Sequence, residues 1–153
     1  MVMAFTGPVA DRLALRELLD SYSNAVMEKD APSWSACWAE DAFWALPEVP
    51  DLEGFSGREA IVAAWVQSMD VYGLDNCTRP MIYVTTPGSI AVDGDVARGT
   101  SYTSEIYQDP HTGKELRVRG RYEDEMARID GRWVFTRRTY RVLHTAHAGE
   151  PVT

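Results

Sequence analysis

The sequence predicts an α+β domain in which N-terminal helices pack on a curved antiparallel sheet with a pocket between the two layers. Two observations favour this fold class. Apolar residues recur at helical spacing in the first half of the chain, and long β-type segments joined by hairpin turns fill the second half. Helices followed by a strand meander are typical of α+β folds, whereas a Rossmann fold alternates the two.

The chain also has no internal repeat, low-complexity tract or linker. We therefore expect one domain over residues 1–153, with flexible tails at residues 1–10 and 146–153.

The first predicted helix spans residues 11–29, where apolar side chains at every third or fourth position form one inward face. It ends before Pro32, because proline disfavours helical geometry in the residue that precedes it. A short second helix follows, with Trp34 and Trp38 one turn apart. Residues 41–46 are predicted to form a short strand.

The third predicted helix begins at residues 56–59, whose letters SGRE match a capping box. In that motif Ser56 and Glu59 satisfy each other's free backbone amides. Apolar residues line one face of the helix that follows, at Ile61, Trp65 and Met69.

Strand patterns dominate from residue 81 onward. Asp93-Gly94-Asp95 and Asp130-Gly131 are hairpin signals, and residues 109–113 form another turn between two strands. The predicted strands are residues 81–86, 89–92, 96–107, about 116–129 and 133–144.

Charged and apolar side chains mix on both faces of the last strand. Trp133 and Phe135 share a face with Arg137 and Arg141, because side chains alternate along a strand. In a sheet with one face under helices and the other in water, apolar side chains would lie on the covered face and charged side chains on the open face. We infer that one face lines a polar-tipped cavity and that the other meets a second subunit.

The composition excludes several functions. Acidic residues outnumber basic ones by 23 to 15, for a net charge of −8, whereas a nucleic-acid binder needs a basic surface. Anionic membranes are disfavoured for the same reason, and no apolar run is long enough to span a bilayer. Two cysteines and three histidines show no metal-ligand spacing, so we expect no metal, no cofactor and a cytoplasmic setting.

Five short motifs occur in order between residue 11 and about residue 144. They are a Tyr22-(x7)-Asp30 pair, WAEDAFW at 38–44, GREAI at 57–61, VDGD at 92–95 and IDGRW at 129–133. In this order they resemble the SnoaL-like family, which shares the NTF2-like, cystatin-like cone with scytalone dehydratase, ketosteroid isomerase and hexachlorocyclohexane dehydrochlorinase. The resemblance implies cofactor-free work on a small hydrophobic, aromatic ligand in an internal pocket, and a homo-oligomer (trimer or dimer).

The dehydrochlorinase resembles this sequence most by its site residues. Its catalytic aspartate falls on Asp30, a pocket tryptophan on Trp44, a pocket cysteine on Cys77 and an arginine of the last strand on Arg138. The histidine that pairs with the aspartate falls on Arg79, which stays protonated at neutral pH and cannot act as a base. The resemblance thus implies a pocket without the usual histidine.

Asp30 has two interpretations. At the edge of an apolar stripe its carboxylate would be partly desolvated, which raises its pKa toward that of a usable base. Alternatively it caps the next helix, because Asp before Ala31-Pro32 suits a helix start. Arg79 either pairs with Asp30 or a developing negative charge, or is a surface arginine before Pro80.

Tyrosines are further acid–base candidates, because a phenol donates a proton or a hydrogen bond to oxygen; the alternative is that they fill the core. A buried Arg138 needs an acid or an anionic ligand, and Asp124 on the neighbouring strand is an internal partner. The predicted catalytic residues are Asp30, Arg79, Tyr22 and Arg138. The predicted substrate-binding residues are Trp44, Trp65, Cys77, Tyr102, Val118, Tyr122, Tyr140 and Val142.

Three functions follow from these observations. The preferred one is a cofactor-independent lyase, dehydratase or isomerase that moves a proton on a small aromatic or alicyclic molecule. The missing histidine favours a second, a non-catalytic small-molecule-binding protein. The third is a small structural subunit of a ring-hydroxylating dioxygenase, because those subunits share the fold.

Overall fold

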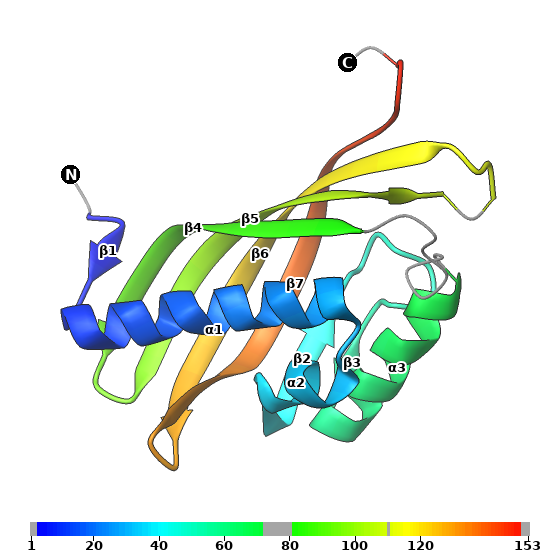
Figure 1. Ribbon diagram of the computed structural model, residues 1–153. Helices are drawn as coiled ribbons and strands as arrows, with labels where there is room; N and C mark the ends of the chain where they lie inside the picture. The colour runs from blue at the N-terminus through cyan, green and yellow to red at the C-terminus, as the bar shows by residue number, and fades with distance from the viewer. Residues whose placement is uncertain (1–2, 72–80, 110, 151–153) are drawn as a thin grey trace.

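A computed structural model describes residues 3–71, 81–109 and 111–150 of the chain, and in it three helices lie on one side of a curved sheet (Figure 1). The first half of the chain forms β1 (Phe5–Thr6), α1 (Val9–Glu28), α2 (Ala31–Ala36), β2 (Trp38–Ala45), β3 (Phe55–Ser56) and α3 (Arg58–Val71). The second half forms β4 (Ile82–Asp93), β5 (Val96–Gln108), β6 (Glu115–Ile129) and β7 (Arg132–His147).

The sheet follows the order β1-β4-β5-β6-β7-β2-β3. Its centre is the predicted antiparallel meander of β4, β5, β6 and β7. However, β1 runs parallel to β4, and β2 runs parallel to β7, so the sheet is mixed rather than wholly antiparallel. Both parallel strands come from the helical half of the chain: β1 precedes α1, and β2 lies between α2 and α3.

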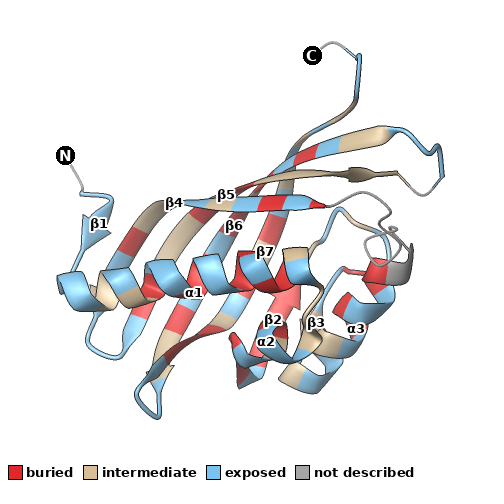
Figure 2. Cartoon of the chain, viewed as in Figure 1, coloured by how far each residue is buried: buried red, intermediate tan, exposed pale blue. Residues whose placement is uncertain are grey.

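The core lies between α1 and the inner face of the sheet (Figure 2). Leu15, Leu18, Leu19, Tyr22 and Val26 of α1 are all buried, as their helical spacing predicts. They form one cluster with inward residues of the long strands and with the aromatic side chains of α2, β2 and α3. This packing holds the helix layer against the inner face of the sheet.

Trp38 is not helical, which corrects one prediction. The second helix ends at Ala36, and Trp38 begins β2, where its backbone pairs with β7 at Phe135. Its ring nevertheless contacts the Trp34 ring, with centroids 5.3 Å apart. The one-turn spacing therefore marked a contact between a helix and a strand.

The third helix starts one residue later than its predicted capping box requires. Ser56 belongs to β3, and Gly57, with a φ of 89°, precedes the first helical residue. The two segments predicted on either side of Pro87-Gly88 are one strand, β4, with an irregularity between Pro87 and Ser89. Proline lacks the N–H that regular pairing needs at that point.

Ordered structure extends into both segments predicted to be tails. At the N-terminal end, β1 pairs with β4 and α1 begins at Val9. At the other end, β7 continues to His147, whose ring lies 2.9 Å from the Asp109 carboxylate.

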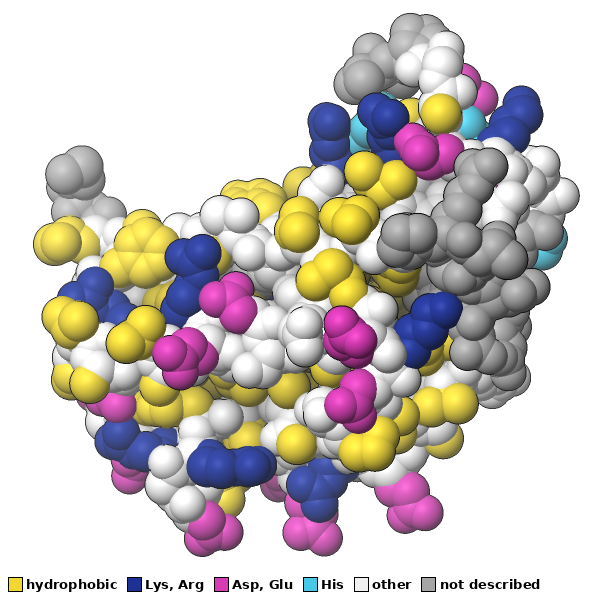
Figure 3. Space-filling model, viewed as in Figure 1, with side chains coloured by type: hydrophobic (Ala, Val, Ile, Leu, Met, Phe, Trp, Pro, Cys, Tyr) yellow, Lys and Arg dark blue, Asp and Glu magenta, His cyan; other side chains and the backbone are white. Residues whose placement is uncertain are grey.

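The molecular face that carries α1 shows side chains of both charges among scattered apolar ones (Figure 3). Within the described residues, no helix is long and apolar enough to cross a membrane.

Candidate active site

A cavity of about 460 Å³ lies between the helix layer and one end of the sheet's inner face. This volume falls in the range of small-molecule sites, roughly 300–1,000 Å³. Its wall is mostly apolar and aromatic, with a few polar groups. The lining residues are Tyr22, Val26, Trp44, Leu46, Glu48, Val49, Pro50, Leu52, Trp65, Ser68, Met81, Tyr83, Glu105, Tyr107, Leu116, Val118, Tyr122, Tyr140, Val142 and Thr145.

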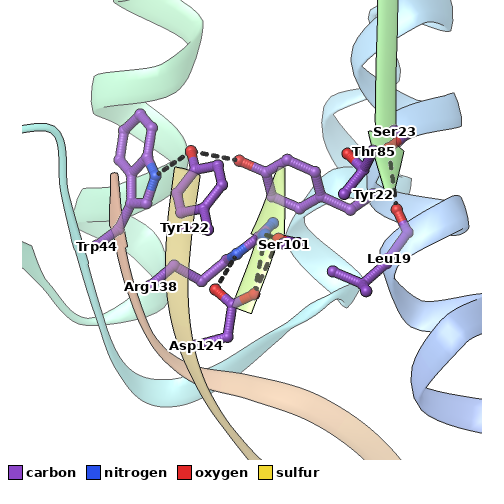
Figure 4. A network of polar contacts seen from close by, with 9 residues as sticks. All are labelled: Leu19, Tyr22, Ser23, Trp44, Thr85, Ser101, Tyr122, Asp124 and Arg138. Atoms are coloured by element: carbon purple, nitrogen blue, oxygen red, sulfur yellow. Dashed lines mark hydrogen bonds and ion pairs between the residues drawn. The ribbon is translucent and has the colours of Figure 1, made fainter. Parts of the chain in front are cut away.

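One wall of the cavity carries a short chain of hydrogen bonds between aromatic side chains (Figure 4). The Trp44 indole donates to the Tyr122 hydroxyl over 3.3 Å, and that hydroxyl lies 3.4 Å from the Tyr22 hydroxyl. Burial raises the pKa of both phenols, so both remain protonated at neutral pH. They are therefore hydrogen-bonding groups rather than bases.

Arg138 lies behind this wall and outside the cavity lining, in a buried ion pair (Figure 4). Its guanidinium donates to Asp124 over 2.7 and 3.2 Å and to the Ser101 hydroxyl over 3.2 Å. Burial alone would lower the pKa of Arg138, but the Asp124 carboxylate holds it above its ordinary value. The internal partner that the sequence offered for Arg138 is thus the observed one.

The same guanidinium packs on the cavity tyrosines. Its central carbon lies 3.8 Å from the centre of the Tyr122 ring and 4.4 Å from that of Tyr22. A cation held against an aromatic face is attracted by the ring's π electrons. Arg138 therefore positions the two phenols from behind and partly offsets the effect of burial on their pKa values.

Glu105 is a carboxyl group of the cavity that the sequence did not predict. It lies on β5 and faces the cavity, where it accepts a hydrogen bond from the Tyr140 hydroxyl over 3.4 Å. Thr103 lies 3.3 Å from the same hydroxyl, so it can donate to Tyr140 while Tyr140 donates to Glu105. Burial raises the pKa of Glu105 to about 7, and the bond from Tyr140 offsets part of that rise.

Gly120 explains how Tyr140 reaches Glu105. A Cβ atom added at Gly120 would clash with the ring and hydroxyl of Tyr140, which lies across β6 at this point. Any larger residue would displace the phenol, since well-packed interiors have no room for added atoms. Gly120 is therefore a packing requirement of the Glu105–Tyr140 pair.

Most of the predicted pocket residues do line this cavity. They are Tyr22, Trp44, Trp65, Val118, Tyr122, Tyr140 and Val142. Cys77 and Arg79 lie outside the described residues.

Besides Arg138, the predicted site residues Asp30 and Tyr102 lie outside the cavity lining. Asp30 caps α2: it accepts from the Ser33 backbone N–H over 3.0 Å and from the Ser33 hydroxyl over 2.6 Å. These bonds lower its pKa, so Asp30 is an ionised helix cap rather than a desolvated base. Tyr102 is 47% exposed, because it alternates with inward-facing Ser101 and Thr103 and so lies on the opposite face of β5.

The polar groups of the cavity are carboxyl, hydroxyl and indole groups. Its lining includes two acidic residues, Glu48 and Glu105, and no basic residue within the described ranges. Among the same residues, no group of three His, Cys, Asp or Glu side chains could hold a metal ion. The arrangement suits hydrogen bonding and proton exchange with a ligand.

The family model of the SnoaL-like domain matches residues 8–139. A candidate scytalone dehydratase from Novosphingobium aromaticivorans superposes with a TM-score of 0.73 at 19% identity, over 95% of this chain and 92% of its own. A candidate aromatic ring hydroxylase from the same organism superposes with a TM-score of 0.76 at 24% identity, and the match covers 94% of this chain and 96% of the hydroxylase chain. A hexachlorocyclohexane dehydrochlorinase from Novosphingobium barchaimii superposes with a TM-score of 0.75 at 17% identity, and the match covers 95% of this chain and 94% of the dehydrochlorinase chain.

No curated protein matches the sequence significantly. The likenesses to solved structures establish the NTF2-like cone, and the match of the domain model covers most of the chain. The chain therefore belongs to the SnoaL-like family.

Proposed function

We propose that the protein is a cofactor-independent lyase, dehydratase or isomerase that moves a proton on a small, largely apolar molecule. The observation that carries this proposal is Glu105, a carboxyl group with a pKa of about 7 inside an aromatic cavity. A general base works best when its pKa lies near the working pH, because both protonation states are then populated.

Glu105 takes the role that the resemblance gave to Asp30. The Asp30 carboxylate accepts two hydrogen bonds at the start of α2 and does not line the cavity. Glu105 lines the cavity, and Tyr140 holds its carboxylate in place. In its ionised form Glu105 takes a proton from carbon, and in its protonated form it returns the proton to carbon or to a leaving oxygen.

The structural neighbours support the same reaction class. Two of them are named for a dehydratase and a dehydrochlorinase, and both of those reactions remove a proton and a leaving group from a small molecule. The apolar wall fits an aromatic or alicyclic ring, since the cavity buries the ring while few polar groups orient it.

A test needs no natural substrate. The probe 5-nitrobenzisoxazole opens when a base removes its ring proton: the N–O bond breaks, and a coloured cyanophenolate forms. We expect the wild-type protein to accelerate this opening with a pH midpoint near 7. Glu105→Gln should lose at least about 100-fold of the rate, because general-base catalysis contributes about 10²–10⁴-fold.

Asp30→Asn is the matched control, because it also converts a carboxylate to an amide but at the surface. It should retain the wild-type rate and pH midpoint. An equal loss in both variants, or no loss in Glu105→Gln, would refute the assignment. Binding of the probe without ring opening would instead identify a small-molecule-binding protein.

A further inference from the structure

We propose that the cavity binds an organic cation, an ammonium group carried on a small apolar frame, with the Glu105 carboxylate as its counter-ion. The aromatic wall packs on the frame and lies beside the positive charge. The proposal names the class of ligand, goes beyond the proposed function and does not depend on proton transfer.

Two carboxylates that face the interior differ in their partners. Asp124 is 5% exposed and is paired inside the protein with Arg138, over 2.7 Å. Glu105 forms no ion pair with a described residue, and its hydrogen-bond partner among them is the neutral Tyr140 hydroxyl. A carboxylate that is withdrawn from water without a counter-charge is costly, so a cation from outside the protein stabilises ionised Glu105.

The second carboxylate oxygen of Glu105, Oε2, is open to a ligand. Tyr140 donates to Oε1, and no described residue donates to Oε2. Among the described residues, the polar atoms that are both enclosed and unpartnered do not include Oε2. Because Oε2 is unpartnered but not enclosed, and Glu105 lines the cavity, a ligand atom there can reach it.

Tyrosines on three strands surround this carboxylate. Tyr107 lies two residues further along β5 and hence on the same face. Tyr83 is the register partner of Glu105 on β4, and Tyr140 of β7 bonds Glu105 directly. All three line the cavity. Aromatic rings attract a cation that lies within about 6 Å of their centres, so these tyrosines suit an ammonium group paired with Glu105.

The fixed charges of the cavity favour a positive ligand over a negative one. Glu48 adds a second carboxylate to the lining, which has no basic residue within the described ranges. The two guanidinium groups behind or beside the wall already have acidic partners: Arg138 pairs with Asp124, and Arg141 lies 3.6 Å from Glu48. Glu105 is therefore the lining carboxylate that lacks a positive partner in the described part of the chain.

Binding of a cation should depend on pH through Glu105. Its pKa of about 7 leaves the carboxyl largely protonated at pH 6 and ionised at pH 9. Burial keeps three neighbouring phenols protonated over this range, because it raises the pKa values of Tyr83, Tyr122 and Tyr140. Since only ionised Glu105 pairs with a cation, the affinity should be about tenfold lower at pH 6 than at pH 9.

Two isosteric probes test the site. Phenyltrimethylammonium and tert-butylbenzene have the same shape, but the first has a positively charged nitrogen where the second has carbon. A titration followed by tryptophan fluorescence reports binding, because Trp44 and Trp65 line the cavity. At pH 9 we expect the wild-type protein to bind the cation about tenfold more tightly than the hydrocarbon.

Glu105→Gln should lose both the preference for the cation and its pH dependence. It should still bind tert-butylbenzene, which shows that the cavity is intact. Asp30→Asn is the matched control, because it also converts a carboxylate to an amide and removes the same net charge, but away from the cavity lining. It should retain the preference and the pH dependence.

Three results would overturn the cation site. They are a wild-type protein that binds the cation no more tightly than the hydrocarbon at pH 9, a wild-type cation affinity that does not change with pH, and a preference that persists in Glu105→Gln. The benzisoxazole assay separates this failure from that of the proposed function. Ring opening without a cation preference would refute only the cation site, whereas a cation preference without ring opening would support the site and refute proton transfer.

Discussion

At the scale of single residues, the chemistry of the cavity depends on how its environment sets the pKa of Glu105. Burial raises that pKa to about 7, and the hydrogen bond from Tyr140 opposes the rise. The bond favours the ionised carboxylate, because a donated hydrogen bond stabilises negative charge.

Tyr140→Phe should therefore raise the pKa of Glu105 further. The pH midpoint of benzisoxazole opening should move upward from about 7, while the ring remains to fill the space beside Gly120. A pH–rate profile measures this shift, with Tyr102→Phe as the control. An unchanged or lower midpoint would contradict the role given to Tyr140.

The same carboxyl should make stability depend on pH. Its folded-state pKa is raised from 4.5 to about 7, so between these values the folded state holds a proton that the unfolded state has released. Stability from this group is present below the unfolded pKa and is lost as the pH rises through the folded pKa. Glu105→Gln removes this dependence.

We expect Glu105→Gln to unfold at the same denaturant concentration as the wild type at pH 4 and to be more stable at pH 8. The gain at pH 8 should be on the order of 3 kcal/mol, the energy of the shift. Urea unfolding at both pH values measures it. A variant less stable than wild type at pH 8 would show that the carboxylate is not desolvated.

The sequence could predict tyrosines and tryptophans near a pocket, but it did not predict Glu105. A single Glu in a strand suggests a solvated position, and only its alternation with inward Ser101 and Thr103 indicates that it faces the core. Its environment depends on Tyr140 of β7, 35 residues away in sequence. Such a long-range contact leaves no local signal in one sequence.

At the scale of secondary-structure elements, Asp30 stabilises the start of α2 rather than a substrate. Its carboxylate accepts the bonds that the first turn of this short helix would otherwise lack. Asp30→Ala should cost about 1 kcal/mol in the free energy of unfolding, whereas Asp30→Asn, which keeps an acceptor oxygen, should cost less. Thermal unfolding and the benzisoxazole assay test this together: a large loss of rate with unchanged stability would restore Asp30 to the active site.

Hairpins were the most predictable elements. Asp130 and Gly131 adopt positive φ values of 51° and 78°, as the Asp-Gly signal requires. The strands of the helical half were less predictable, because β2 pairs with β7 by contacts that local propensity does not encode. Trp38 shows where prediction from local spacing fails. Its spacing from Trp34 fits a helix, yet pairing with β7 decides its conformation.

At the scale of the whole molecule, the order of weak motifs predicted the cone, although each motif alone was compatible with several folds. What the order could not predict is how the helix layer is joined to the sheet. Arg138 provides one such link, because it bonds Asp124 of β6 and Ser101 of β5 and packs on Tyr22 of α1. One buried cation of β7 thus contacts two other strands and the main helix.

Asp124→Asn should consequently destabilise the entire fold. It removes the negative partner of Arg138 and leaves a buried charge uncompensated, which costs about 3–5 kcal/mol. The double variant Asp124→Leu/Arg138→Met removes both charges, so it should be more stable than Asp124→Asn, because apolar replacement of a buried pair is often tolerated. Urea unfolding followed by tryptophan fluorescence measures both. A loss below about 1 kcal/mol in Asp124→Asn would mean that the Arg138 charge is compensated without Asp124, and the buried ion pair would then not be what stabilises the fold.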